Sequence, residues 1–172
     1  MLVKIPPMNF NNIEDIRRNG FTGFVTVTEL WTDKSCIPRM KGVYLVIDPT
    51  FKKTEFINPG VGGFFKGKDP NVSIEELKIN HVENSQVLYI GKAGSPAGQA
   101  TLSSRLGQYL RFGETKNVGH WGGRLIWQLK NHRALIFCWK PTPNDDPRKI
   151  EKQLLSEYIK QFGAMPFANL VG

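Results

Sequence analysis

The spacing of hydrophobic and polar positions along the chain predicts strands and helices in alternation. Runs of apolar, β-branched and aromatic residues at 42–47, 87–90 and 134–139 are typical of short strands. Leucines at positions 102, 106 and 110 recur every fourth residue, which predicts a helix that buries one stripe and ends at Gly113. We therefore expect an α+β fold with a small central antiparallel sheet flanked by helices.

The other helices are predicted from the residues at their ends. The last one, at 147–162, has Asp146 as a cap, Pro147 at its first position and Gly163 after its last turn. Its buried stripe comprises Ile150, Leu154, Tyr158 and Phe162. Shorter helices are expected at 11–19, 74–80 and 121–131, the last loosened at its start by two glycines.

The 172 residues are enough for one domain, and they contain no repeat, low-complexity tract or linker. Residues 41–172 hold all the predicted strands, and a Gly-, Pro- and Lys-rich insert at 50–84 separates the first two. Residues 1–40 are an N-terminal extension rather than a separate domain. Their composition does not decide whether they brace the sheet or form an arm toward a partner.

The chain is basic, with 23 Lys and Arg against 15 Asp and Glu and a net charge of +8. This excess suits a polyanionic partner, nucleic acid first and acidic membrane surfaces as the alternative. Because no segment has the length of a membrane span or the pattern of a signal peptide, we expect a soluble cytoplasmic protein with no membrane partner. The two cysteines and three histidines lack the spacing of a zinc site.

Several residues with chemical potential follow one another in a definite order. Two predicted strands each carry a tyrosine beside a glycine, in Gly42-Val43-Tyr44 and Tyr89-Ile90-Gly91. The next helix places Arg105 and Tyr109 four positions apart, and thus on one face. The last helix carries Glu151 near its start, and Asn169 stands in the tail that follows.

These motifs, over residues 41–172, resemble those of the GIY-YIG nuclease superfamily. The resemblance implies the GIY-YIG nuclease fold and a Mg²⁺-dependent endonuclease that hydrolyses phosphodiester bonds in DNA. The chain departs from the family in one respect, because 45 positions separate Tyr44 from Tyr89 where typical members have a short hairpin. The insert must therefore loop out of the sheet.

The resemblance also assigns a role to each site residue. Glu151 would hold one Mg²⁺, with Mn²⁺ as an alternative, and Arg105 would bind the phosphate oxygens. A tyrosine would activate water, with Tyr44 preferred to Tyr89. A free tyrosine has a pKa of about 10 and is only about 0.1% phenolate at neutral pH. Lys92 and the metal would supply the positive field that the phenolate needs.

Two further residues of the motif set receive supporting roles. Tyr109 is expected to donate its hydroxyl to the phosphate or to position water. Asn169 is expected to hold the glutamate helix or a metal-bound water.

Two glycine-rich segments are predicted to contact the nucleic acid. Lys66 and Lys68 in the insert would approach the sugar-phosphate backbone, and a plain solvated loop is the alternative. His120 and Arg124 would line the DNA cleft, and a tryptophan that anchors a helix start in the core is the alternative. The insert matches a phosphate-loop spacing except at Asp69, where Ser or Thr is needed, so no nucleotide cofactor is expected.

The sequence thus predicts a stand-alone DNA endonuclease, of a restriction-like or other bacterial type. A catalytically inactive nucleic-acid-binding module and an RNA-directed nuclease remain as alternatives. The residues do not distinguish a monomer from a homodimer, and they do not indicate a cleavage specificity.

Overall fold

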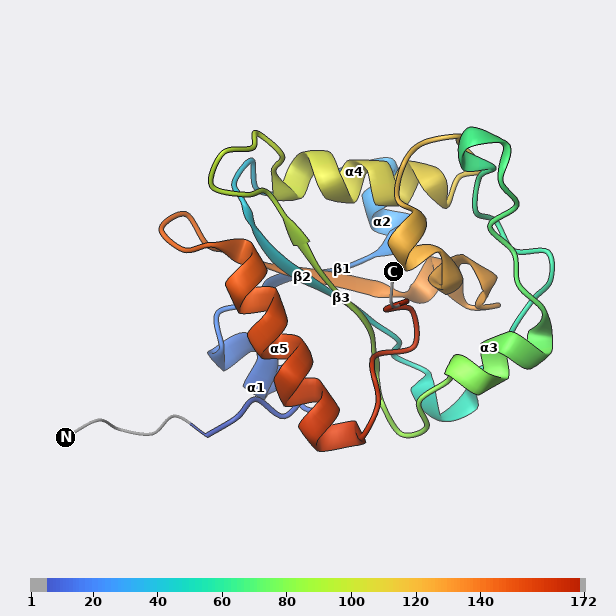
Figure 1. Ribbon diagram of the computed structural model, residues 1–172, viewed down its shortest axis with the longest axis horizontal. Helices are drawn as coiled ribbons and strands as arrows, with labels where there is room; N and C mark the ends of the chain where they lie inside the picture. Colours follow the sequence, from blue (N-terminus) through green and yellow to red (C-terminus); the bar gives the residue numbers. More distant parts are fainter. Residues whose placement is uncertain (1–5, 171–172) are drawn as a thin grey trace.

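In a computed structural model, which describes residues 6–170, a four-stranded antiparallel sheet lies between two layers of helices (Figure 1). The strands are β1 (Thr22–Thr26), β2 (Gly42–Ile47), β3 (Val87–Ala93) and β4 (Ile136–Pro141), in the spatial order β1-β4-β2-β3. The predicted α+β class and the small antiparallel sheet are therefore confirmed.

Within the described residues, five α-helices and four 3₁₀ segments surround this sheet. The α-helices are α1 (Ile13–Arg18), α2 (Val27–Thr32), α3 (Ile74–Asn80), α4 (Leu102–Phe112) and α5 (Pro147–Phe162). The 3₁₀ segments are η1 (Phe51–Lys53), η2 (Phe65–Gly67), η3 (Trp121–Gln128) and η4 (His132–Ala134). The caps predicted for α5 are all present, since Asp146 accepts from the Arg148 amide and Gly163 is left-handed.

Two predicted elements differ from what forms. The strand expected at 87–90 continues to Ala93, and this extension carries Lys92 into the sheet. The helix expected at 121–131 is the 3₁₀ segment η3, which is interrupted at Gly123. The Tyr109 hydroxyl occupies the space beside Gly123 and donates to its carbonyl, which explains why a regular helix does not continue there.

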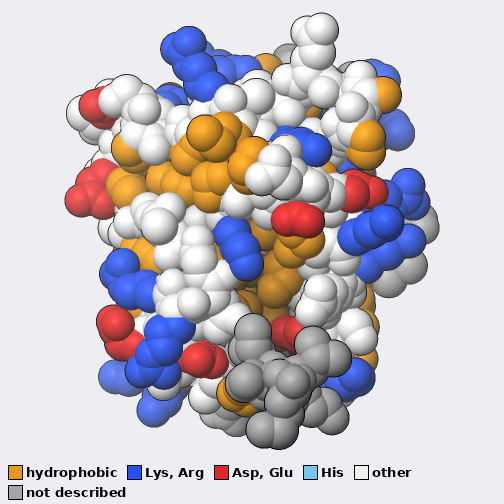
Figure 2. Space-filling view, turned by 90° about the vertical axis from the view of Figure 1, so that its left-hand side faces the viewer, with side chains coloured by type: hydrophobic (Ala, Val, Ile, Leu, Met, Phe, Trp, Pro, Cys, Tyr) orange, Lys and Arg blue, Asp and Glu red, His pale blue; other side chains and the backbone are white. Residues whose placement is uncertain are grey.

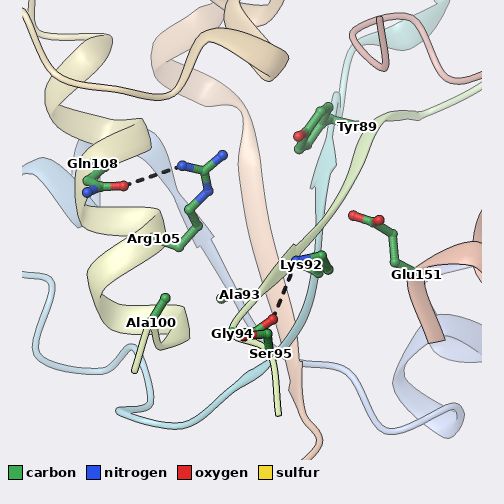
Figure 3. A pocket seen from close by; sticks show the side chains of 9 residues that line it. All are labelled: Tyr89, Lys92, Ala93, Gly94, Ser95, Ala100, Arg105, Gln108 and Glu151. Atoms are coloured by element: carbon green, nitrogen blue, oxygen red, sulfur yellow. Dashed lines mark hydrogen bonds between the residues drawn. The ribbon is translucent and has the colours of Figure 1, made fainter. Parts of the chain in front are cut away.

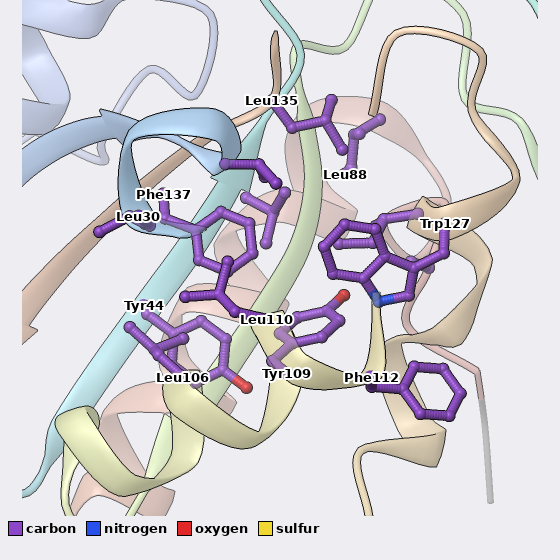
Figure 4. Close-up of a cluster of buried hydrophobic side chains, with 14 of the residues drawn as sticks. Leu30, Tyr44, Leu88, Leu106, Tyr109, Leu110, Phe112, Trp127, Leu135 and Phe137 are labelled. Carbon is purple, nitrogen blue, oxygen red and sulfur yellow. The ribbon is translucent and has the colours of Figure 1, made fainter. Parts of the chain in front are cut away.

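Strand β2 is central, and all six of its residues are buried. Tyr44 and Val46 point into one core with α2, α4 and η3 (Figure 4), while the alternate residues Val43, Leu45 and Ile47 point into a second core with α1 and α5. Burial on both faces explains why this strand is a continuous apolar run rather than an alternating one.

The N-terminal residues of the described chain brace the sheet. Strand β1 pairs with β4, and α2 packs against α4. Neither element is predicted from the hydrophobic pattern of the sequence. A capping box formed by Thr26 and Glu29 begins α2 directly after the strand.

The insert leaves the sheet and returns to it at an irregularity in the pairing of β2 with β3, because the register shifts between Val46 and Ile47. Ile47 lies opposite Val87 at the start and end of the insert, and Tyr44 lies opposite Gly91 further along. The insert covers η3, where the Gln128 side chain bonds to the backbone of both Ile57 and Val72. Within residues 6–170, no helix is both long and apolar enough to cross a membrane.

Candidate active site

An open pocket of about 410 Å³ lies where α4 and α5 meet at β3, the edge strand (Figure 3). Four of its lining residues belong to the predicted site: Tyr89, Lys92, Arg105 and Glu151. The others are Ala93, Gly94, Ser95, Ala100 and Gln108. In Figure 3, Arg105 enters from α4 on one side of β3, and Glu151 enters from α5 on the other.

Glu151 presents a carboxylate to this pocket. Burial raises its pKa, and the positive charges of Lys92, Arg148 and Arg105 oppose the rise. Among residues 6–170, none forms a hydrogen bond or ion pair with this carboxylate, so its oxygens remain available to a ligand. The same part of the chain contains no group of three or more His, Cys, Asp and Glu able to hold a metal.

A single carboxylate is sufficient for the protein part of a Mg²⁺ site. Mg²⁺ keeps several of its waters and binds through one or two carboxylates together with substrate phosphate oxygens. Glu151, half-buried and without a partner among the described residues, satisfies that requirement. A zinc site, which needs three or four protein ligands, does not fit.

Two neighbours hold the guanidinium of Arg105 at the pocket through one nitrogen, Nη1. Its Nη1 donates to the carbonyl of Gly119 at 3.2 Å and lies 3.4 Å from Gln108 Oε1. Helix α4 begins one turn earlier in a capping box formed by Thr101 and Ser104, which sets the position of the arginine. Arg105 lines the pocket, and the planar guanidinium matches the geometry of phosphate oxygens.

The two motif tyrosines are neighbours but have different environments. Tyr89 lines the pocket, whereas Tyr44 is fully buried, with its hydroxyl 2.8 Å from His120 Nε2. Burial raises the pKa of both phenols, and the charge of Arg105 lowers both. The burial of Tyr44 favours Tyr89, rather than the initially preferred Tyr44, as the phenol that meets a pocket water.

The glycines of the two tyrosine motifs have steric roles. A Cβ on Gly91 would lie 2.5 Å from Tyr44 Cζ and 2.6 Å from Tyr89 Cε1, so only glycine lets the two rings approach. A Cβ on Gly42 would collide with the Lys140 carbonyl oxygen of strand β4. Gly91 is therefore needed for the packing of the two tyrosines, and Gly42 for the close approach of β2 to β4.

Tyr109 and His120 lie in the core behind the pocket. Their rings stack with centroids 3.6 Å apart, and the Tyr109 hydroxyl donates to the Gly123 carbonyl at 2.6 Å. Both residues are fully buried. An interior imidazole does not reach a bound nucleic acid, so the expected direct contact of His120 with DNA does not fit this placement. Burial holds the pKa of His120 well below its usual value, and the nearby Arg105 acts in the same direction.

Asn169 binds the edge of β3 rather than the glutamate helix. Its side chain accepts from the Ile90 amide at 2.9 Å and donates to the Ile90 carbonyl at 2.8 Å. The adjacent Ala168 amide donates to the Leu88 carbonyl. The tail thereby satisfies the open edge of the strand that carries Tyr89 and Lys92.

The residues predicted to contact nucleic acid lie outside the pocket lining. Lys66 and Lys68 are exposed in the insert, next to Phe65, whose ring packs against Gly119. Arg124 stacks over Trp121 at 4.4 Å and donates to its carbonyl, so the guanidinium is partly used within η3. On the face shown in Figure 2, Lys and Arg side chains are spread among hydrophobic ones rather than gathered in one patch.

Comparison of the chain with protein-family models, curated proteins and solved structures finds no match. The interpretation of the site therefore rests on its own geometry and on the order of its motifs.

Proposed function

We propose that the protein is a Mg²⁺-dependent endonuclease of the GIY-YIG type that hydrolyses phosphodiester bonds in DNA. One observation carries the proposal: Tyr89, Lys92, Arg105 and Glu151, from three different elements, line a single open pocket. Their side chains are a phenol, an ammonium, a guanidinium and a carboxylate, which together meet the needs of phosphodiester hydrolysis.

In this reaction a water oxygen attacks phosphorus, and the bond from phosphorus to the leaving sugar oxygen breaks. Tyr89, on the pocket wall, first loses its proton to solvent, and the resulting phenolate orients the water and accepts its proton. Arg105 binds the phosphate oxygens as negative charge builds on them. When bound at Glu151, Mg²⁺ supplies charge for the departing oxyanion, which leaves with a proton from solvent.

Burial raises the pKa of Tyr89 and so disfavours the phenolate. The proton transfer therefore requires positive charge beside this side chain. Arg105 opposes that rise, and Lys92 places a second cation in the same pocket. We assign Lys92 this electrostatic role. Tyr109 and Asn169 support the site from outside it, Tyr109 by holding Gly123 and Asn169 by holding Ile90.

The charge of the chain and the openness of the pocket support a polyanionic substrate. A net charge of +8 favours a polyanion, and the pocket opens to solvent at the edge of the sheet. The exposed Lys66 and Lys68 would extend the contact along the sugar-phosphate backbone.

The test is cleavage of supercoiled plasmid with Mg²⁺ or with EDTA. The wild type is expected to nick or linearise the plasmid only with metal. Glu151→Gln should reduce cleavage by at least about 100-fold and still bind the plasmid. Glu157→Gln, on the same helix but away from the pocket, is the matched control and should cut like the wild type.

Metal binding can be measured separately from cleavage. Mg²⁺ should raise the melting temperature of the wild type and of Glu157→Gln, but not of Glu151→Gln. Equal cleavage by the wild type and Glu151→Gln would place the metal ligand elsewhere. Wild-type binding without cleavage, across several metals and substrates, would favour an inactive binding module. Cleavage of RNA alone would identify an RNA-directed nuclease.

A further inference from the structure

His120 is a buried polar residue that has no role in the proposed reaction. Its ring is fully buried, its Nε2 lies 2.8 Å from the Tyr44 hydroxyl, and its Nδ1 has no hydrogen-bond partner among the described residues. A buried polar group with an unsatisfied atom is costly, and its retention calls for a physical explanation.

The tautomer of His120 follows from this arrangement. The imidazole is neutral and carries one proton, because burial disfavours its charged form. A proton on Nδ1 would leave an N–H group unsatisfied in the core, which is rarer than an unsatisfied acceptor. If Nε2 carries the proton, this N–H group donates a hydrogen bond to the Tyr44 oxygen. The Nε2–H tautomer is therefore favoured.

In this tautomer the Tyr44 hydroxyl proton points away from His120. Since the Tyr44 oxygen accepts from His120, its own proton is free to be donated elsewhere. The Tyr89 ring is the neighbour on the pocket side, with centroids 5.9 Å apart, and both rings crowd the point where Gly91 lacks a Cβ.

We propose that His120 is a positioning residue, whose Nε2–H donates to Tyr44 and thereby directs the Tyr44 hydroxyl proton toward the Tyr89 oxygen. The inference rests on the proposed function in one respect, the assignment of water activation to Tyr89. A hydrogen bond received by a phenolate stabilises it over the neutral phenol. In agreement, the pKa of Tyr89, raised chiefly by burial, is lowered by the Tyr44 hydroxyl.

Other groups also act on Tyr89 and must be held constant in a test. The titratable and charged groups around it come from every neighbouring element: Tyr44 (β2), Lys92 (β3), Arg105 and Tyr109 (α4), His120 (before η3) and Glu151 (α5). We call the proposed chain of hydrogen bonds from His120 through Tyr44 to Tyr89 the relay. Variants at Tyr44 and His120 change this relay and leave the charged groups around Tyr89 in place.

The experiment is a titration of the four tyrosines, labelled with carbon-13 at Cζ, in the full chain without DNA or metal. The Tyr89 signal is assigned from Tyr89→Phe. Tyr44→Phe should raise the pKa of Tyr89 by about one unit, because a hydrogen bond to the phenolate is lost. Tyr158→Phe is the matched control, since it removes a buried hydroxyl bonded to Ser85 on the other face, and it should leave Tyr89 unchanged.

His120 is tested with two variants. His120→Leu removes the donor and should raise the pKa of Tyr89 as Tyr44→Phe does. His120→Gln keeps an N–H donor and should leave Tyr89 closer to the wild type. Circular dichroism checks that each variant folds. If His120→Leu does not fold, Tyr44→Phe still tests whether the Tyr44 hydroxyl lowers the pKa of Tyr89.

An unchanged Tyr89 pKa in Tyr44→Phe and in every folded His120 variant would overturn the relay. Equal shifts in the Gln and Leu variants would also overturn it, by showing that His120 acts through packing alone. Because the titration needs neither DNA nor metal, it tests the relay even if the wild type cuts nothing. If the wild type cuts, the rising limb of its pH–rate profile should move upward by the same amount in Tyr44→Phe.

Discussion

The missing side chain of Gly91 determines how close the two motif tyrosines can lie. Tyr44 is fully buried, and its hydroxyl is hydrogen-bonded to His120. Its ring therefore has no room to move away from a methyl group added at Gly91. The Gly91 position thus couples the interior phenol to the phenol on the pocket wall. Gly91 is therefore required for packing, because it has no side chain, and not for backbone flexibility.

Gly91→Ala is expected to destabilise the protein by about 1–3 kcal/mol, because the new Cβ would overlap both tyrosine rings. Gly107→Ala, in α4, is the matched control. Its Cβ would meet only the flexible end of Arg111, at 3.3 Å, and Ala favours a helix over Gly by about 1 kcal/mol. Urea unfolding measures both, and a Gly91→Ala protein as stable as the control would contradict the crowding described here.

At the scale of elements, strand β3 is both the carrier of the site and an edge of the sheet. Tyr89 and Lys92 stand on it, and the tail around Asn169 covers its open side. An uncovered edge offers free backbone groups to other chains and frays more easily. The tail therefore protects the position of the site residues without touching them.

Asn169→Ala removes both hydrogen bonds to Ile90 and should cost about 1–2 kcal/mol of stability. The Ile90 amide should exchange with solvent faster than in the wild type, as measured by hydrogen-exchange NMR. Asn80→Ala, which loses one exposed bond at the end of α3, is the control and should leave Ile90 unaffected. Unchanged exchange at Ile90 would mean that the tail does not hold the strand.

Most elements could be predicted from local sequence because their signals are local. The cap, proline and glycine of α5 lie within or beside that helix, and the apolar run of β2 reports its burial on both faces. Strand β1 and α2 went unassigned, although the spacing of Thr26 and Glu29 is a capping-box signal. The kinked η3 was missed because the Tyr109 hydroxyl that binds Gly123 comes from another helix.

The candidate site could be predicted in residue type but not in geometry. The order of motifs indicated Tyr89, Arg105 and Glu151, and the pocket brings these three together. Which tyrosine reaches the pocket depends on how α4 and the loop before η3 pack over β2, and no local pattern contains that information. The bond from His120 to Tyr44 joins positions 76 apart, so spacing could not reveal it.

At the scale of the whole molecule, the buried polar groups make stability depend on pH in opposite directions. The pKa of His120 is depressed in the folded state, so His120 stabilises the fold above the ordinary value of 6.5, and this stabilisation is lost as pH falls. The pKa of Glu151 is raised, so its contribution is present below 4.5 and is lost as pH rises. The two groups therefore change stability in opposite directions as pH moves through the mildly acidic range between 4.5 and 6.5.

Between about pH 6.5 and pH 5, the wild type should lose up to about 1.4 kcal/mol of unfolding free energy per pH unit through His120. His120→Gln should lose less over the same interval, because glutamine does not titrate. Urea unfolding at several pH values checks this, and parallel profiles for the two proteins would show that His120 takes up a proton equally in the folded and unfolded states.

The insert enters and leaves the sheet at one place, since Ile47 and Val87 are directly paired. The pocket lies toward the opposite end of the same two strands, where Gly42 pairs with Ala93. A segment whose two ends already meet can change in length at its exposed turn, residues 66–68, without separating the two strands. The chain thus offers a natural grafting point, at which a longer or shorter exposed loop would leave the strand pairing beside the pocket unchanged.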